Sequence, residues 1–417
     1  MLNQVYKIVK DVPIPKMVKV RQTFDRVRVE DPAAELKKEL SRAEITGTVR
    51  PGMKVAIAVG SRGIEGLPVL VRTIADFLKE NGAEPFIAAA MGSHGGACAE
   101  GQRAILEGFG ITEESVGCPL RVTSETTVIG TTPDGLPVQI DKNAAAADGI
   151  VLINHIKPHT GFRGEYESGL MKMLAIGLAK QPGAEYCHFR GFRYMHESVP
   201  KFGKAIMASA NIMFGVGIVK NAYDEIAEIR AMTDTEIIEK EPQLLKRAKE
   251  LYGRIWLDHV DVLVVDEISK HLSGDGMDPC ITGRFGTPYA GGGIDATRVC
   301  VLDIMEESHR SGSGLGLADC TTEKAFAKYD RDITYANAIT SRVLVTTKIP
   351  TVLPNEKMCI QTAIITIDDT PAEEVTLVRI KNTKKLEYIL ISENLVEEAK
   401  KSGHVEILSE PFEMELD

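Results

Sequence analysis

The sequence predicts a two-domain α/β protein, with a parallel α/β sheet domain first and a smaller α/β or α+β domain after it. In the first half, short β-branched runs alternate with helical patterns, as is typical of a parallel sheet. The second half has fewer helical patterns, but VDVLVVDEI (260–268) and RVCVLDIM (298–305) indicate further strands. We place the boundary near residue 258, which gives domains 1–258 and 259–417, and we expect the active site in the cleft between them.

The expected elements follow one another along the 417-residue chain. In the first half we expect helices at 31–45, 67–83 and 100–110, strands within 54–63, 85–96 and 147–162, and a hairpin at 122–141 turning at Pro133-Asp134-Gly135. In the second half, 233–256 predicts a long helix interrupted at Pro242, 341–348 suits another strand, and 358–367 suits a strand or a helix.

Composition and charge exclude several classes of partner. The net charge is −10 and no basic block occurs, so we expect neither nucleic acid nor an anionic membrane as a partner. No stretch approaches the roughly 18 to 20 apolar residues of a membrane span. The N-terminus, MLNQVYKIVKDVPIPK, has no apolar signal-peptide segment, so we expect a cytoplasmic protein. The seven cysteines form no CxxC pair and are expected to be reduced, and a homo-oligomer is compatible with the sequence.

Polar residues follow three of the expected parallel strands. The first strand leads to Ser61-Arg62, the second to Ser93-His94, and the third to Asn154-His155, then Lys157 and His159. Ligand sites in open α/β sheets form at the carboxyl ends of strands. We therefore expect one site that includes Arg62, His94, His155, His159, Lys172 and His188.

A single lysine, Lys172, stands in the apolar run GLMKMLAIGLA (169–179). A lysine in a buried helix costs free energy unless it is paired, neutralised or chemically used. The residues alone also allow a side chain that reaches water from a partly buried helix. In the same way, each histidine could be a hydrogen-bonded loop residue and Arg62 a surface arginine; it is their joint occurrence at successive strand ends that favours a site.

Several common chemistries lack their motifs. His155 and His159 have the spacing of a helical zinc pair, but Pro158 disfavours a helix there and the glutamate of HExxH is missing. FGVGIVKNA (214–222) lacks the third glycine of a dinucleotide fingerprint, and no GxSxG elbow is present.

The ordered set GSR, GSH, KPHTGF, the lysine run and His188 resembles the lactate racemase superfamily over roughly residues 50–190. These are nickel-dependent 2-hydroxyacid racemases and epimerases, isomerases whose cofactor is a nickel-pincer nucleotide. The resemblance implies that Lys172 holds this cofactor covalently and that His188 is the protein ligand to nickel. It also implies that His94 and His159 are the acid/base pair, while hydride moves reversibly between the substrate C2 and the cofactor. The resemblance also implies that the cofactor-synthesis enzymes are partners of this chain. In a host that lacks them, we expect the protein to be produced with Lys172 unmodified.

The remaining assignments follow from the same resemblance. We assign Ser61 to the cofactor, and Arg62, His155 and Arg284 to the substrate, with Arg284 lying in the candidate segment HLSGDGMDPCITGRFG (271–286). Val59 stands where the family motif has an aspartate, and the segment between His159 and Lys172 is longer and more charged. These departures predict a 2-hydroxyacid other than lactate, larger or derived from a sugar. Two alternatives stay open on the same scaffold: a metal-free ligand-binding protein, and a lyase or isomerase that uses the Lys172 amine.

Overall fold

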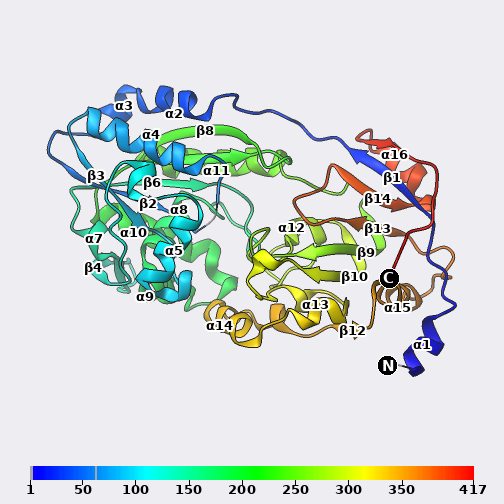
Figure 1. The fold of residues 1–417 in the computed structure, drawn as a ribbon. Helices are drawn as coiled ribbons and strands as arrows, with labels where there is room; N and C mark the ends of the chain where they lie inside the picture. Colours follow the sequence, from blue (N-terminus) through cyan, green and yellow to red (C-terminus); the bar gives the residue numbers. More distant parts are fainter. Residues whose placement is uncertain (1–2, 62) are drawn as a thin grey trace. The chain divides into compact units, whose positions relative to one another are not determined.

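The computed structural model describes residues 3–61 and 63–417, and the chain divides into two compact units (Figure 1). One unit is Arg26–Tyr252, and the other combines the residues before Arg26 with Gly253–Asp417. The mixed α/β fold class is therefore confirmed. The predicted assignment of residues 1–25 to the N-terminal domain differs from this division. The reason is that β1 (Met17–Gln22) pairs antiparallel with β14 (Tyr388–Ser392) and β15 (Val405–Ile407).

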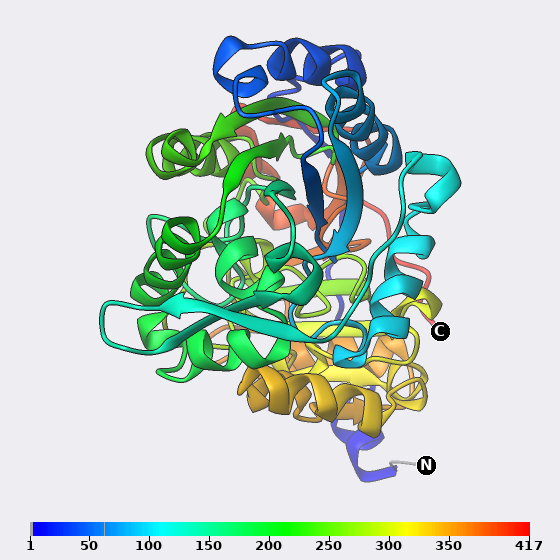
Figure 2. The same cartoon turned by 90° about the vertical axis from the view of Figure 1, so that its left-hand side faces the viewer.

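The Arg26–Tyr252 unit contains a five-stranded sheet in the order β3-β2-β6-β7-β8. Its strands are β2 (Lys54–Val59), β3 (Glu84–Ala89), β6 (Gly149–His155), β7 (Ile212–Lys220) and β8 (Ile226–Thr233). The first four are parallel, and β8 runs antiparallel to β7. The predicted hairpin forms as β4 (Thr126–Thr131) and β5 (Pro137–Asp141), and its long cyan-green strands are visible in Figure 2.

Helices cover both faces of this sheet. They are α2 (Pro32–Leu40), α3 (Ala43–Thr46), α4 (Leu67–Glu80), α5 (Ala99–Gly108), α6 (Glu113–Val116), α7 (Lys142–Ala145), α8 (Leu170–Lys172), α9 (Lys180–His188), α10 (Met195–Ser209) and α11 (Asp234–Glu250). Along β2, Val55 and Ile57 pack with residues of α2 and α4, whereas Ala56 and Ala58 pack with residues of α8, α10 and α11. The alternation of side chains along a strand thus gives two cores. The small alanines allow the segment that carries Lys172 to lie close to the sheet.

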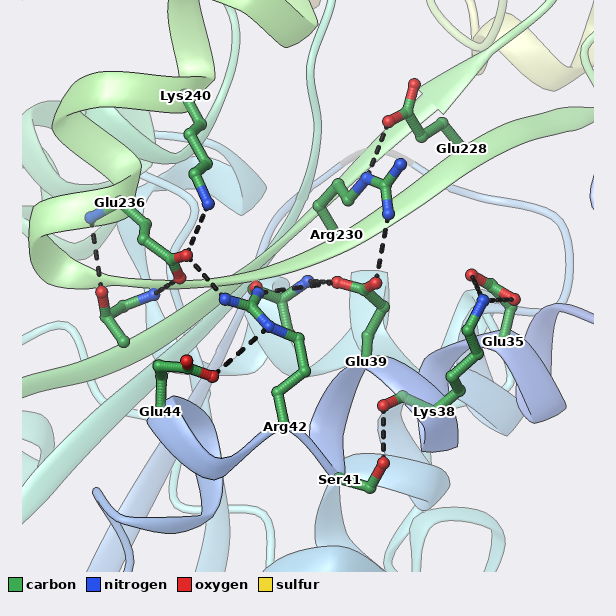
Figure 3. A network of polar contacts seen from close by, with 12 residues as sticks. Glu35, Lys38, Glu39, Ser41, Arg42, Glu44, Glu228, Arg230, Glu236 and Lys240 are labelled. Carbon is green, nitrogen blue, oxygen red and sulfur yellow. Dashed lines mark hydrogen bonds and ion pairs between the residues drawn. The ribbon is translucent and has the colours of Figure 1, made fainter.

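Ion pairs tie the outer helices to the edge of the sheet (Figure 3). Arg42 donates to Glu236 at 2.6 Å and to the carbonyl of Ala231 at 2.6 Å. Buried Glu39 accepts from Arg230 at 3.2 Å. Burial opposes ionisation of Glu236, but hydrogen bonds from Lys240 and Arg42 outweigh it and lower the pKa of Glu236 to about 2. The network therefore joins α2 and α3 to β8 and α11.

The second unit contains an eight-stranded sheet in the order β12-β11-β10-β9-β13-β14-β1-β15. The strands not yet given are β9 (His259–Ile268), β10 (Asp295–Ile304), β11 (Cys320–Thr322), β12 (Thr351–Leu353) and β13 (Leu377–Ile380). Its helices are α1 (Asn3–Val9), α12 (Pro279–Thr282), α13 (Glu323–Ala327), α14 (Arg331–Ser341), α15 (Glu356–Ile365) and α16 (Val396–Lys401). The strands from β12 to β13 are parallel, so the predicted α/β character of this part is confirmed.

Several local predictions are corrected by the structure. The segment 341–348 is a short 3-10 turn over Leu344–Thr347 instead of a strand, because Arg342 ends α14 in a left-handed conformation (φ +60°). The ambiguous run 358–367 lies mostly in helix α15. Helix α11 continues through Pro242, which has no N–H for the carbonyl of Ile238. That carbonyl instead accepts a hydrogen bond from the Tyr166 hydroxyl at 2.6 Å.

Within the described residues, no helix is both long enough and apolar enough to cross a membrane.

Candidate active site

The carboxyl ends of β2, β3 and β6 lie at one edge of the five-stranded sheet. The register places Val59 beside both Ala89 and Ile153, so the residues after each strand emerge together. The structure places Ser61 after β2, His94 after β3 and His155 at the end of β6, as predicted. Arg62 lies outside the described residues.

Ser61 and His94 are in direct contact. The Ser61 hydroxyl forms a short hydrogen bond with Nδ1 of His94. The hydroxyl can accept a hydrogen bond from Nδ1–H or donate one to an unprotonated Nδ1, and the tautomer with Nδ1–H leaves the lone pair on Nε2. The contact between these two residues, which follow different strands, was not predicted, because Ser61 was expected to contact the cofactor.

His159 is held in a tight loop after β6. Its backbone N–H donates to Oε2 of Glu167 at 2.8 Å, and its Nδ1 accepts from the N–H of Gly161 at 2.9 Å. Because Nδ1 accepts, the ring proton of neutral His159 is assigned to Nε2. Burial lowers the pKa of His159 well below its usual value, and the nearby Lys172 and His188 lower it further. His159 is therefore neutral near pH 7.

The same electrostatic coupling shows that three predicted residues lie together. Lys172 and His188 both act on the charge of His159. The ring of Phe192 lies 6.2 Å from that of His159 and 6.0 Å from that of His188, so it borders both histidines. Gly161 allows this approach, since a Cβ there would lie 2.7 Å from Cε1 of Phe192. His159, Lys172, His188 and Phe192 form what we call the lysine–histidine cluster.

Lys172 ends the short helix α8, and a π-helical segment follows at Met173–Leu178. Single-turn π segments in helices are frequent at functional sites. Met171 and Leu174 beside Lys172 are fully buried, but Lys172 itself is only partly buried. The expectation that this helix buries the Lys172 side chain is therefore only partly met. A second lysine lies just after the π segment: Lys180, the first residue of helix α9, is fully buried, at 1% exposure.

The two groups of predicted residues are linked through the backbone. The N–H of Gly92, in the loop before His94, donates to the carbonyl of Gly177 at 2.9 Å. A Cβ on Gly177 would lie 2.6 Å from the carbonyl oxygen of Ala90, so only glycine allows this packing. The loop that carries His94 therefore lies directly against the π segment that follows Lys172.

His188 ends helix α9 with one ring nitrogen engaged. Its Nδ1 lies 2.8 Å from the carbonyl oxygen of Ala184. A carbonyl only accepts, so Nδ1 carries the proton and Nε2 carries the lone pair. This is the arrangement in which a histidine serves as a metal ligand. The neighbouring Cys187 is fully buried, and burial raises the pKa of its thiol to about 12.

Within 3–61 and 63–417, no group of three or more His, Cys, Asp or Glu side chains is arranged to hold a metal ion. A metal at His188 would therefore have at most one further donor of these types among the described residues, and the rest would come from a cofactor or substrate.

Helix α11 supplies two residues that sequence reasoning missed. The Lys249 ammonium lies 2.6 Å from Oε1 of Glu167, whose side chain is completely buried. Buried Glu241 accepts from the N–H of Met171 at 2.9 Å, at the start of the segment that carries Lys172. Burial raises the pKa of Glu241 to about 8. One indication of this contact was present in the sequence, the additional charge at Glu167. Its partner Lys249 could not be identified, because it lies 82 residues away along the chain.

The structure places the other two predicted substrate contacts, His155 and Arg284, without testing their roles. His155 is partly buried, and its neighbour Asn154 donates to the carbonyl of Gly169 at 2.9 Å. Arg284 belongs to the other unit, where its Nη2 lies 2.8 Å from Asp319 and donates to the carbonyls of Ala296 and Thr297. The assignments of His155 and Arg284 to a substrate stay predictions.

The geometry defines an α/β protein with an ionisable site at the carboxyl edge of a parallel sheet. Residues 10–198 match the lactate racemase N-terminal domain family, so the predicted resemblance to the lactate racemase superfamily is confirmed. The match includes every predicted site residue except Arg284.

A solved structure supports the fold. The lactate racemase apoprotein from Thermoanaerobacterium thermosaccharolyticum superposes with a TM-score of 0.53 over 89% of this chain and 99% of that chain. The two sequences are 14% identical, so the likeness concerns the fold. A comparison with curated protein sequences gives no match.

Proposed function

We propose that the protein is a racemase or epimerase that inverts C2 of a 2-hydroxyacid with a nickel-pincer nucleotide attached to Lys172. Similarity to lactate racemase already indicates an isomerase of the racemase or epimerase class. The observation that carries the finer proposal is the lysine–histidine cluster, in which the ring of Phe192 lies 6.2 Å from that of His159 and 6.0 Å from that of His188, and Lys172 is close enough to lower the pKa of His159.

The residues of the cluster suit this cofactor. Lys172 is partly buried beside apolar neighbours, so a covalent bond at Nζ would remove a charge from a poorly solvated position. His188 presents Nε2 as a ligand because Nδ1 is bound to Ala184. When bound, the group would supply sulfur and carbon donors to nickel and would accept a hydride reversibly.

The two remaining histidines would handle the hydroxyl proton. His94 is the proposed base, in the tautomer whose Nδ1–H donates to the Ser61 hydroxyl and whose Nε2 carries a lone pair. His159, with Nδ1 occupied by Gly161, holds its proton on Nε2 and donates a hydrogen bond to the substrate oxygen while it is neutral; it delivers a proton only after it has gained a second one. Racemisation in both directions needs these roles to exchange. For His159 to act as the base, its hydrogen bond to Gly161 must break.

The substrate is proposed to be larger or more polar than lactate. Val59 removes a carboxylate that would otherwise be near the site, while Arg163 and Glu167 add charge to the His159 loop. Arg62 is proposed to bind the substrate carboxylate, because its guanidinium can donate two parallel hydrogen bonds. His155 and Arg284 are the proposed contacts to the remaining polar groups of the substrate.

The proposal is tested with enzyme produced together with the cofactor-synthesis enzymes. Single enantiomers of 2-hydroxyacids, including sugar acids, that carry deuterium at C2 are incubated with it, and the products are separated by chiral chromatography. Hydride transfer retains deuterium in the inverted product, and His94→Asn or His159→Asn abolishes inversion. Loss of deuterium to solvent would instead indicate proton abstraction at C2. Borohydride trapping of a carbonyl substrate on Lys172 would indicate a Schiff-base lyase or isomerase.

A further inference from the structure

Lys180 is a buried lysine that the proposed chemistry does not use. It begins helix α9, and its side chain is 1% exposed. The ammonium lies 2.9 Å from Oδ2 of Asp141, which is fully buried, and donates to Oε1 of Gln102 at 2.8 Å and to the carbonyl of Ala89 at 2.5 Å. Ala89 is the last residue of β3, so Lys180 joins α9 to the strand that leads to His94.

The backbone of Lys180 is held in an unfavourable conformation. Its φ is +55°, in the left-handed region that residues other than glycine rarely adopt. Such a conformation persists only where the surrounding structure fixes it, and it occurs preferentially at functional sites. A buried ion pair also gives little stability compared with apolar side chains of the same size. Stability of the core alone therefore does not explain a lysine here.

Gln102 connects Lys180 to the His94 loop. Its Nε2 donates to the carbonyl of Gly92 at 3.0 Å and to the carbonyl of His94 at 3.3 Å. An ammonium can only donate, so Lys180 requires Oε1 of Gln102 to face it. This fixes Nε2 on the other side, toward the two loop carbonyls. The charge on Lys180 thereby sets the orientation of the amide that holds the loop.

We propose that Lys180 is a positioning residue that acts through Gln102 to hold His94 in place for proton transfer. The proposal rests on the function proposed above for His94, but its structural step can be measured without cofactor. The same loop is bound to the π segment by the hydrogen bond from Gly92 to Gly177. Lys180 thus couples the segment that carries Lys172 to the loop that carries His94.

The variant Gln102→Glu tests this coupling most directly. A carboxylate at position 102 still accepts from Lys180, which keeps it ionised, but it cannot donate to Gly92 and His94. Lys180→Met removes the ammonium, and Lys246→Met, at an exposed position of α11, is the matched control. Because Lys180→Met leaves Asp141 buried without its partner, the double variant Asp141→Asn/Lys180→Met is measured beside it. Oδ1 of residue 141 can still accept from Asn143 and Ala144 in that variant.

Two readouts use protein without cofactor: amide hydrogen exchange across residues 92–96, and the ¹⁵N signals of the His94 ring during a pH titration. We expect exchange about tenfold faster in Gln102→Glu and in both Lys180 variants, as the loss of one or two hydrogen bonds predicts. The ring signals of His94 should shift, while Lys246→Met stays at wild-type values. In loaded enzyme, kcat should fall about tenfold or more with the mass of the Lys172 peptide unchanged.

Unchanged exchange and unchanged His94 ring signals in Gln102→Glu would overturn the inference, even if Lys180→Met lowers the melting temperature. Altered ring signals in a protein whose wild type inverts no hydroxyacid would support the coupling and contradict the proposed function.

Discussion

Replacing Glu167 by glutamine should weaken the fold locally and misplace His159. The two carboxylate oxygens serve different partners: Oε1 accepts from Lys249 at 2.6 Å, and Oε2 accepts from the N–H of His159 at 2.8 Å and from Arg163 at 3.3 Å. An amide has one acceptor oxygen, so its NH₂ group must face either Lys249 or the backbone of His159. Either orientation sets a donor against a donor.

The expected cost follows from the number and exposure of these partners. A hydrogen bond to a charged group contributes about 1.5–3 kcal/mol, but the Lys249 and Arg163 side chains can regain water. Their side chains are 40% and 30% exposed. We therefore expect Glu167→Gln to lower the free energy of unfolding by about 2–3 kcal/mol. If the proposed function holds, kcat should fall by about 10- to 100-fold through displacement of His159.

Glu165→Gln is the matched control, because Glu165 lies two residues away on the same loop and is exposed. Urea unfolding measures the free-energy difference, and amide exchange at His159 reports the loop directly. Equal stability, equal exchange and equal kcat in the Glu167 and Glu165 variants would refute the reasoning.

Three further changes have expected outcomes in the same unit. The pKa of Glu241 is raised to about 8 by burial, so the folded state binds this proton more tightly than the unfolded state. The stability of wild type relative to Glu241→Gln should therefore decrease as pH rises from about 4.5 to about 8, which urea unfolding at several pH values would show. Gly169→Ala should destabilise by about 2–4 kcal/mol, because its Cβ would lie 2.0 Å from Oε1 of Glu241; a wild-type melting curve would contradict this packing. The pKa of Glu236 is lowered to about 2, so its contribution to the free energy of unfolding is present above pH 4.5 and lost toward pH 2. Between these pH values, the free energy of unfolding should fall less steeply in Glu236→Gln than in wild type.

Much of the N-terminal sheet could be predicted because its signals are local. The alternation of strands with helices, the hairpin at Pro133-Asp134-Gly135 and the polar residues after β2, β3 and β6 depend on short stretches of sequence. One site containing His159, Lys172 and His188 was expected from the polar residues after successive strands, and the family resemblance added a role for each of them. Gly215 and Gly217, which belong to the segment without a complete dinucleotide fingerprint, lie in β7, where a Cβ would crowd Leu170 or Ile156, respectively.

The rest depends on contacts between residues far apart in the sequence. The buried Lys180 was not singled out from the sequence. Its partners Asp141 and Gln102 come from separate elements, so no local pattern indicates that they meet. The roles of Lys249 and Glu241 require α11 to pack on the site, and no local pattern indicates that. The placement of β1 beside β14 likewise joins residues more than 350 positions apart, as the pair Val20 and Ile389 illustrates.

The most direct test of the central claim is the mass of the peptide that contains Lys172. The protein is produced with the cofactor-synthesis enzymes, and its intact mass, peptide map and nickel content are measured. We predict a nucleotide-sized adduct on Lys172 and near-stoichiometric nickel, with the nickel lost in His188→Ala. Unmodified Lys172 and no nickel, in a preparation in which a known lactate racemase acquires its cofactor, would contradict the account.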